Sequence, residues 1–181
     1  FLHSIKLEAN FINSELNSDD LAFFAPEVKG WKRIFQLRGL AKGTIDNLTA
    51  KKMLIKSGNN FIDGDIALKG LPDINNTFID LQANELKTTV ADIATIIPSL
   101  KTITQPNFAR LGNINYKGNF TGFINDFVAF GTINTNLGTV TGDINMKLPQ
   151  NKPAIYLGKI STESFRLGEF INTSQLGTIV F

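Results

Sequence analysis

The amino-acid sequence repeats itself, and this constrains the fold more than any other feature of the chain. DDLAFFAP at 19–26 recurs in outline as ADIATIIP at 91–98, LRGLAKGTIDNL at 37–48 as YKGNFTGFINDF at 116–127, and GDIALKGLP at 64–72 as GDINMKLP at 142–149. The paired segments are 72, 79 and 78 residues apart. Repetition at a nearly constant spacing is typical of stacked architectures, in which each unit buries its apolar face against its neighbours. We therefore expect a run of a longer array, with repeats at 1–78 and 79–154 and the start of a third at 155–181.

The composition indicates an ordered protein and excludes several functional classes. Of the 181 residues, 43% are hydrophobic, so the chain can bury a sizeable core. The 18 Lys and Arg residues are scattered and nearly balanced by 16 Asp and Glu, which argues against a nucleic-acid partner. Cys is absent, so disulfides and thiolate chemistry are excluded. No apolar run approaches a membrane span, and a signal peptide or anchor would have to lie outside this sequence.

Alternation at a period of two predicts β-strands. In NINYKGNFTGFI at 113–124, apolar residues or Gly alternate with Asn, Lys and Thr, as expected for a strand with one buried face. Asn125 and Asp126 are expected to form a two-residue turn, as are Asp46 and Asn47 in the first copy. NLGT at 136–139 predicts the next reversal, so the segment is expected to be an antiparallel meander.

The inward positions of this meander define a candidate groove. We expect the fold to be mainly β, with strands whose apolar and polar residues alternate and whose outer face is exposed to solvent. A parallel sheet covered by helices would not show this alternation. The predicted groove-lining residues are Leu37, Gly39, Gly43, Ile45, Ile62, Ile66, Leu68, Tyr116, Phe120, Ile124, Phe127, Ile133, Val140, Ile144, Met146 and Leu148.

Each copy is also expected to contain one short helix of about two turns. In SDDLAFFAPEV and VADIATIIPSL the apolar spacing departs from two, Asp20 or Asp92 precedes the apolar residues as a potential cap, and Pro follows. The simplest role for this helix is to cover the end of the sheet. A role in contacting a partner or a membrane through Phe23 and Phe24 is the alternative.

Glycines on the inward face require an explanation, because Gly within a strand costs stability. Gly39, Gly43, Gly118, Gly122 and Gly131 are in phase with the apolar residues, as is Gly142. Three interpretations are open: the sheet bends sharply at these positions, a facing wall packs closely, or a ligand occupies the space.

The sequence contains no pattern that predicts an active site. His3 is the only His, no metal-ligand spacing occurs, and the nucleophile-elbow and phosphate-loop motifs are absent. Asp63 and Asp65 are expected to flank turns as solvated structural residues. Trp31, between cations in KGWKR, fits either a half-buried loop or a lipid-headgroup boundary. We therefore expect no enzyme, no cofactor and no metal.

The run YKGNFTGFINDFVAFGTINTNLGTVTGDINMKLP at 116–149, followed by YLGKISTESFRLGEF at 156–170, resembles the repeat region of the TamB/AsmA-like family of envelope proteins, in its Bacteroidota form. The resemblance implies an elongated β-taco, that is, a U-shaped antiparallel sheet with a hydrophobic trough. It also implies a periplasmic location in a parent protein anchored in the inner membrane. The implied partners are phospholipid and a BamA-like outer-membrane protein of the TamA type, the latter bound through parts of the parent outside this sequence.

The function expected from groove and resemblance together is phospholipid transport between the two membranes, in support of outer-membrane biogenesis. A trough of Ile, Leu, Val, Phe and Gly can take hydrocarbon, at about 0.8 kcal/mol per fully buried methylene. It offers no fixed polar group for a headgroup, so selectivity is expected to be low. The main alternative is a non-enzymatic scaffold that binds outer-membrane proteins by strand addition. A sugar-binding β-sandwich and an enzyme rank behind these two.

Overall fold

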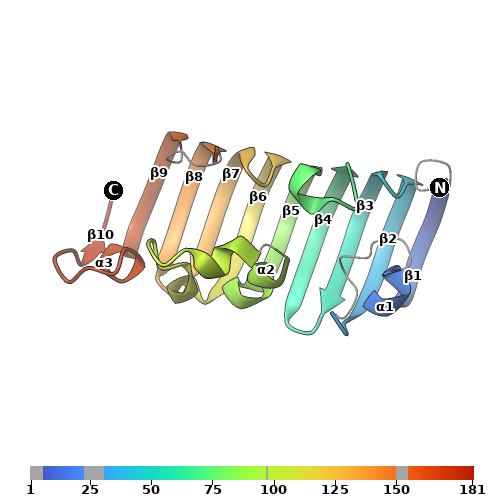
Figure 1. Ribbon diagram of the computed structural model, residues 1–181, viewed down its shortest axis with the longest axis horizontal. Helices are drawn as coiled ribbons and strands as arrows, with labels where there is room; N and C mark the ends of the chain where they lie inside the picture. The colour runs from blue at the N-terminus through green and yellow to red at the C-terminus, as the bar shows by residue number, and fades with distance from the viewer. Residues whose placement is uncertain (1–5, 23–30, 97, 150–154) are drawn as a thin grey trace.

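The computed structural model describes residues 6–22, 31–96, 98–149 and 155–181, and these form one antiparallel sheet. The ten strands lie side by side in chain order, β1 to β10, and the sheet does not close into a barrel (Figure 1). At roughly 4.8 Å per strand, the sheet extends on the order of 50 Å along its long axis. The predicted mainly β, antiparallel fold is confirmed. The predicted Phe23 and Phe24 contact lies outside the described residues, as does His3.

The strands are ten to twelve residues long, except for the last. They are β1 (Leu7–Asn17), β2 (Ile34–Thr44), β3 (Asn47–Ser57), β4 (Asn60–Lys69), β5 (Phe78–Thr89), β6 (Asn113–Phe123), β7 (Asp126–Thr135), β8 (Gly138–Lys147), β9 (Ile155–Arg166) and β10 (Thr178–Ile179). The helices are α1 (Ser18–Leu21), α2 (Val90–Ile96) and α3 (Leu167–Phe170), with 3-10 turns η2 (Ile74–Asn76), η3 (Pro98–Thr102) and η4 (Phe108–Leu111).

The order of these elements is itself periodic. A strand followed by a helix and three further strands describes β1 to β4, and the same order describes β5 to β8. A third strand and helix, β9 and α3, begin the order again. The first N–H of α1, at Ser18, donates to the carbonyl of Arg33 before β2, and that of α2, at Val90, donates to Gly112 before β6. In both repeats, the same backbone hydrogen bond therefore joins the start of the helix to the residue before the next strand.

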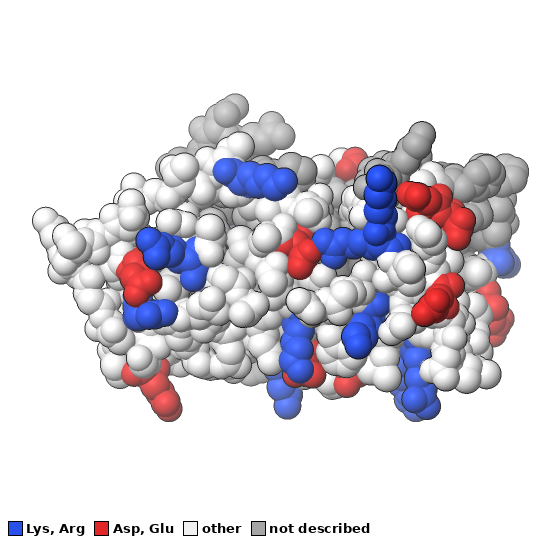
Figure 2. All heavy atoms as spheres, turned by 90° about the horizontal axis from the view of Figure 1, so that it is seen from below, with Lys and Arg blue, Asp and Glu red and all other residues white. Residues whose placement is uncertain are grey.

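The two faces of the sheet differ in chemistry. Cross-strand pairs such as Ile55 with Ile62 and Leu81 with Phe120 put apolar residues on one face, which we call the trough face. The other face carries mostly Lys, Asp, Asn and Thr, although Leu40 on β2 and Val128 and Phe130 on β7 are also exposed there. At the edge of the sheet where the helices lie, seen from below, Lys and Arg are interspersed with Asp and Glu (Figure 2). This mixture of charges gives no basis for recognition of a polyanion.

The hairpin turns lie one residue earlier than the sequence predicted. The turn residues are Ile45 and Asp46, closed by the pair Thr44 and Asn47, rather than Asp46 and Asn47. In the second copy the turn residues are Ile124 and Asn125, rather than Asn125 and Asp126, and Asp126 begins β7. Both registers keep the same residues on the trough face, because the side-chain period is two. The alternation therefore could not distinguish between them.

Small residues line up across the middle of the sheet. From β4 to β8 the register joins Gly64, Ala83, Gly118, Gly131 and Gly142 in one continuous row. We call this the small-residue row. In β1–β2, β2–β3, β3–β4, β4–β5 and β5–β6 the pairing register shifts near mid-strand, and in β8–β9 it shifts near the start of β8. Because a bulge bends its strand, these shifts favour a sheet that bends about its centre line.

Gly118 shows why this row needs glycine. Its φ is +151°, and a Cβ placed there would lie 2.1 Å from the carbonyl oxygen of Phe130 on the neighbouring strand. The missing methyl group would therefore meet backbone rather than open groove. Beside it, the hydroxyl of Tyr116 donates to the carbonyl of Asn119 at 2.7 Å, so this ring lies over the glycine pair of Gly118 and Gly131. Of the three interpretations, backbone bending with a neighbouring side chain over the gap fits these contacts.

Asp65 holds one of the bulges in place. The sequence predicted that Asp63 and Asp65 flank turns, but both lie within β4. One Asp65 oxygen accepts from the backbone N–H of Lys52 at 2.8 Å, and the other from Nζ of Lys51 at 2.9 Å. These two lysines occupy the bulge of β3, and Lys52 has a φ of +51°. The hydrogen bond from Lys51 is the main reason that the pKa of Asp65 lies below its usual value.

The small-residue row gives a matched test of the bend. Gly118→Ala should destabilise the protein by about 1–3 kcal/mol, because the new methyl forces backbone strain and a clash with the carbonyl of Phe130. Gly142→Ala is the control, since its Cβ would meet nothing closer than 3.5 Å. It should change stability by less than about 1 kcal/mol. Urea unfolding followed by circular dichroism measures both, and equal losses would contradict the proposed backbone requirement.

The apolar trough and the pocket under α2

The trough is formed by paired apolar side chains on both sides of the small-residue row. On the side nearer the helices, Leu37, Ile55, Ile62, Leu86, Tyr116, Ile133 and Val140 follow one another across β2 to β8. On the opposite side, Ala50, Ile66, Leu81, Phe120, Ala129 and Ile144 do the same. No Lys, Arg, Asp or Glu occurs among these paired positions, so the face remains apolar across the strands.

Most of these large side chains are only half-buried. Met53 on β3 is 3% exposed and packs with Ala41 and Ala50, while Leu37, Leu48, Ile55 and Ile66 lie partly buried against this cluster. Ile133 is 36% exposed. The described residues supply a single sheet and no second sheet above this face. A broad apolar surface therefore remains in contact with solvent.

Most of the predicted groove residues lie on this face, and three do not. The paired rows contain Leu37, Ile62, Ile66, Tyr116, Phe120, Ile133, Val140 and Ile144. Leu68, Phe127 and Met146 lie on the same face, two residues further along their strands from the small-residue row. Ile45 and Ile124 lie in hairpin turns, and Leu148 lies beyond the end of β8. At Gly39 and Gly43 an added Cβ would point at the backbone of β3, so these glycines shape the sheet and present no side chain to the trough.

The sequence reasoning missed the trough residues of β3 and β5. Their apolar positions change phase at a bulge: Leu48 and Ala50 are followed by Met53 and Ile55, with Lys51 and Lys52 between them. In β5, the phase changes between Ala83 and Leu86. A single extra residue breaks strict alternation without ending the strand. The sequence does contain a signal for these residues. Two stretches of alternation follow one another in opposite phase, with one extra polar residue between them.

The helices lie along one edge of the sheet, at the bottom of Figure 1. There α2, its seven residues predicted by the sequence as a helix of about two turns, covers part of the trough face. A pocket of about 250 Å³ lies beneath it. Its floor is made by Phe35, Ile55, Ile62 and Leu86, and α2 contributes Ile93 and Ile96, with Trp31 at the side.

The N-terminus of α2 is capped by Thr89 rather than by the predicted Asp92. The backbone N–H of Asp92 donates to Oγ1 of Thr89 at 3.0 Å, and that hydroxyl donates to Oδ2 of Asp92 at 2.9 Å. In α1 the cap is Asn17, whose side chain accepts from the N–H of Asp19. Asp92 follows Thr89 by three residues, as Asp20 follows Asn17, so both acidic residues lie in the first helical turn. There their negative charges interact favourably with the helix dipole.

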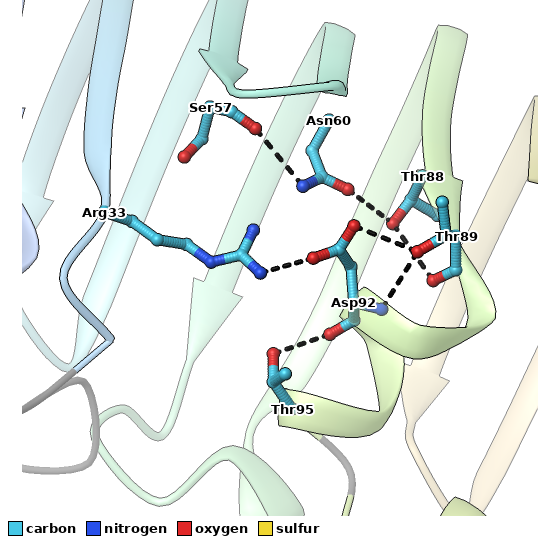
Figure 3. A network of polar contacts seen from close by, with 7 residues as sticks. All are labelled: Arg33, Ser57, Asn60, Thr88, Thr89, Asp92 and Thr95. Atoms are coloured by element: carbon cyan, nitrogen blue, oxygen red, sulfur yellow. Dashed lines mark hydrogen bonds and ion pairs between the residues drawn. The ribbon is translucent and has the colours of Figure 1, made fainter.

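A polar network fastens α2 to the first repeat (Figure 3). Arg33, which comes just before β2, pairs with Asp92 across 59 positions in the chain. The backbone N–H of Arg33 donates to Oγ of the fully buried Ser18 at 3.0 Å, so the start of α1 positions it. Nearby, Thr88 donates to Asn60 at 2.8 Å. The network therefore joins the two repeats at the rim of the pocket.

The electrostatics of this pair favour the charged form of Asp92. The hydrogen bond from Arg33 is the largest cause that lowers the pKa of Asp92, and hydrogen bonds from Thr89 and Asn60 act in the same direction. Burial raises the pKa and opposes them, but it is outweighed. Both side chains keep somewhat over a quarter of their surface exposed, so solvent screens the attraction in part.

The next helix along the edge is fastened by aromatic contacts instead. Phe108 of η4 and Phe165 of β9 each meet Phe170 of α3 edge-on, with ring centroids 5.7 Å apart. The backbone N–H of Asn107 donates to the carbonyl of Phe170. The connection before β6 thus contacts the following helix, as Arg33 before β2 contacts α2. The row of helices is continuous from repeat to repeat.

The described residues contain no group of three or more His, Asp or Glu side chains that could hold a metal ion. Among the same residues, none of the helices combines the length and the apolar composition needed to cross a bilayer. Comparison of the chain with protein-family models, with curated proteins and with solved structures finds no match in any of the three.

The Arg33–Asp92 pair predicts an acid-sensitive helix. Because the folded-state pKa of Asp92 lies below the ordinary Asp value of about 3.9, the stabilisation by this pair is complete above that pH. It is lost as the pH falls through the lower folded-state pKa. Trp31 is the only Trp in the chain and lines the same pocket, so its emission should shift only below about pH 3.9.

Asp92→Asn is the matched variant for this prediction. It keeps the size of the side chain but removes the titrating group that faces Arg33, Thr89 and Asn60. The variant should show the shifted Trp31 emission already at neutral pH and should lack the acid transition. If the variant and the parent protein share the same acid transition, another carboxylate controls the position of α2.

Proposed function

We propose that this protein binds the hydrocarbon chains of phospholipid along its trough and carries them across an aqueous space between two membranes. The observation that supports the proposal most directly is the apolar face that continues from β2 to β8, which the described residues cover only in part, beneath α2. Soluble proteins rarely leave an apolar patch of this extent in water unless it binds something. Burial of that face by acyl chains would offset the cost of its exposure.

The shape of the trough suits an extended chain better than a compact ligand. The apolar rows run across successive strands, so a hydrocarbon lying along them would contact one repeat after another. The rows contain no charged side chain that would fix a headgroup in one place. Binding would therefore be weakly selective and similar at every repeat, and both properties allow a chain to slide.

The resemblance to TamB/AsmA-like repeats supports the same function and supplies its setting, the bacterial periplasm between the inner and outer membranes. It also supports a BamA-like outer-membrane partner of the TamA type, bound by other parts of the parent protein. The chemistry of the trough requires only hydrophobic contact, so the proposal needs no catalytic residue and no cofactor.

The test compares charges on the two faces of one strand. Phe120→Asp and Ile144→Asp place a carboxylate in the trough, where an acyl chain would have to desolvate it. Asn119→Asp and Asn145→Asp place the same charge on the neighbouring, exposed positions of the opposite face. Native mass spectrometry of protein purified gently from bacterial envelopes should find bound phospholipid in the parent and in the controls.

Phospholipid occupancy should fall about tenfold or more in the two trough variants, since a loss of 1.4 kcal/mol corresponds to a factor of ten. Circular dichroism checks that the sheet is retained. If lipid is absent from the parent protein, and labelled lipid is not taken up, the scaffold function is favoured instead. Equal lipid binding by trough variants and controls would also contradict the proposal.

A further inference from the structure

The pocket under α2 is the part of the trough that encloses a ligand on two sides. Elsewhere along the described residues the apolar rows have only the sheet beneath them, so a hydrocarbon there would be covered by the sheet alone. Under α2, the side chains of Ile93 and Ile96 lie opposite Ile55, Ile62 and Leu86. Since the hydrophobic gain follows the area removed from water, each methylene gains more in the pocket than in the open trough.

The volume of the pocket limits what can enter it. The pocket has a volume of about 250 Å³. This is below the usual range for a drug-sized ligand, and it is too small for a headgroup with two acyl chains. It suits the end of one unbranched hydrocarbon chain. Because Ile55, Ile62 and Leu86 belong to both the pocket and the trough, such a chain would reach it directly from the trough.

The polar side chains at the rim already have partners within the protein, including Lys87, whose ammonium pairs with Glu85 at 2.9 Å. Arg33 is bound to Asp92, Thr88 donates to Asn60, and Nδ2 of Asn60 donates to the carbonyl of Ser57 at 3.2 Å. In the part of the chain that the structure describes, no buried side-chain nitrogen or oxygen lacks a hydrogen-bond partner. A ligand with a polar end would find its partners here already engaged. The pocket therefore selects an apolar end.

We propose that the pocket under α2 is a binding site for the terminal segment of a single unbranched hydrocarbon chain, with Arg33 and Asp92 holding α2 over it. The inference rests on the proposed function for the source of that chain, and it adds a defined resting place within an otherwise uniform trough. A helix of seven residues is not stable alone, so its position depends on these contacts. The chain enters methyl end first and leaves its carboxylate or headgroup outside the rim.

Trp31 provides the test, because it is the only Trp and it lines the pocket. A bromine atom quenches indole fluorescence at short range, so 12-bromododecanoic acid, brominated at the chain end, should quench Trp31. 2-Bromododecanoic acid, brominated beside the carboxylate, should quench it much less, and dodecanoic acid should not quench it. Equal quenching by both brominated acids would overturn the inferred orientation.

Two variants of α2 complete the test. Ile96→Asp puts a charge against the pocket and should weaken the apparent affinity for 12-bromododecanoic acid about tenfold or more. Ala91→Asp, at an exposed position of α2 that does not line the pocket, should leave the affinity unchanged. Ile144→Asp, in the distant open trough, should also leave Trp31 quenching unchanged while reducing phospholipid occupancy.

The outcomes separate this inference from the proposed function. Bound phospholipid without any quenching of Trp31 would overturn the pocket site and leave the trough function in place. Quenching of Trp31 by the chain-end bromine, with an apparent affinity that Ile96→Asp alone weakens about tenfold or more, supports the site. Absence of both phospholipid and quenching would overturn both proposals.

Discussion

The continuous antiparallel ladder is the constraint on which the rest of this structure depends. Each strand pairs with its neighbours in chain order, and the register places apolar residues opposite apolar residues from strand to strand. Because the side-chain period is two, a slip of one residue between two strands would turn a whole strand's apolar set toward the polar face. The trough therefore exists only while the ladder keeps its register, although no second sheet packs on the described part of it.

The bulges and the small-residue row let this ladder bend without losing that register. Residues such as Gly118 accept a backbone conformation that side chains rarely adopt, and polar residues such as Asp65 satisfy the backbone where pairing is interrupted. Bending about a central row gives two apolar walls that share a floor. The same devices explain why a sheet with few fully buried large side chains is ordered: its core is thin and spread along the molecule, with Met53 among its best-buried members.

The helices convert part of an open surface into an enclosed one. Their positions depend on contacts between repeats, ionic for Arg33 with Asp92 and aromatic for Phe108 with Phe170. A site formed in this way belongs to the junction of two units rather than to either unit. The trough could thus be uniform in composition and still hold a ligand more tightly at defined intervals, which would suit the proposed binding and release of hydrocarbon.

The sequence by itself determined the strand class, the antiparallel order and most of the trough, because alternation and turn residues are local signals. It left the hairpin register undecided, since placing the turn at Ile45 or one residue later keeps the same residues on one face. It also hid the trough residues of β3, because Lys51 and Lys52 interrupt the alternation at a bulge. Only the tertiary structure decided that Arg33 meets Asp92 and that α2 covers a pocket, because these contacts join residues 59 positions apart, which no local pattern relates.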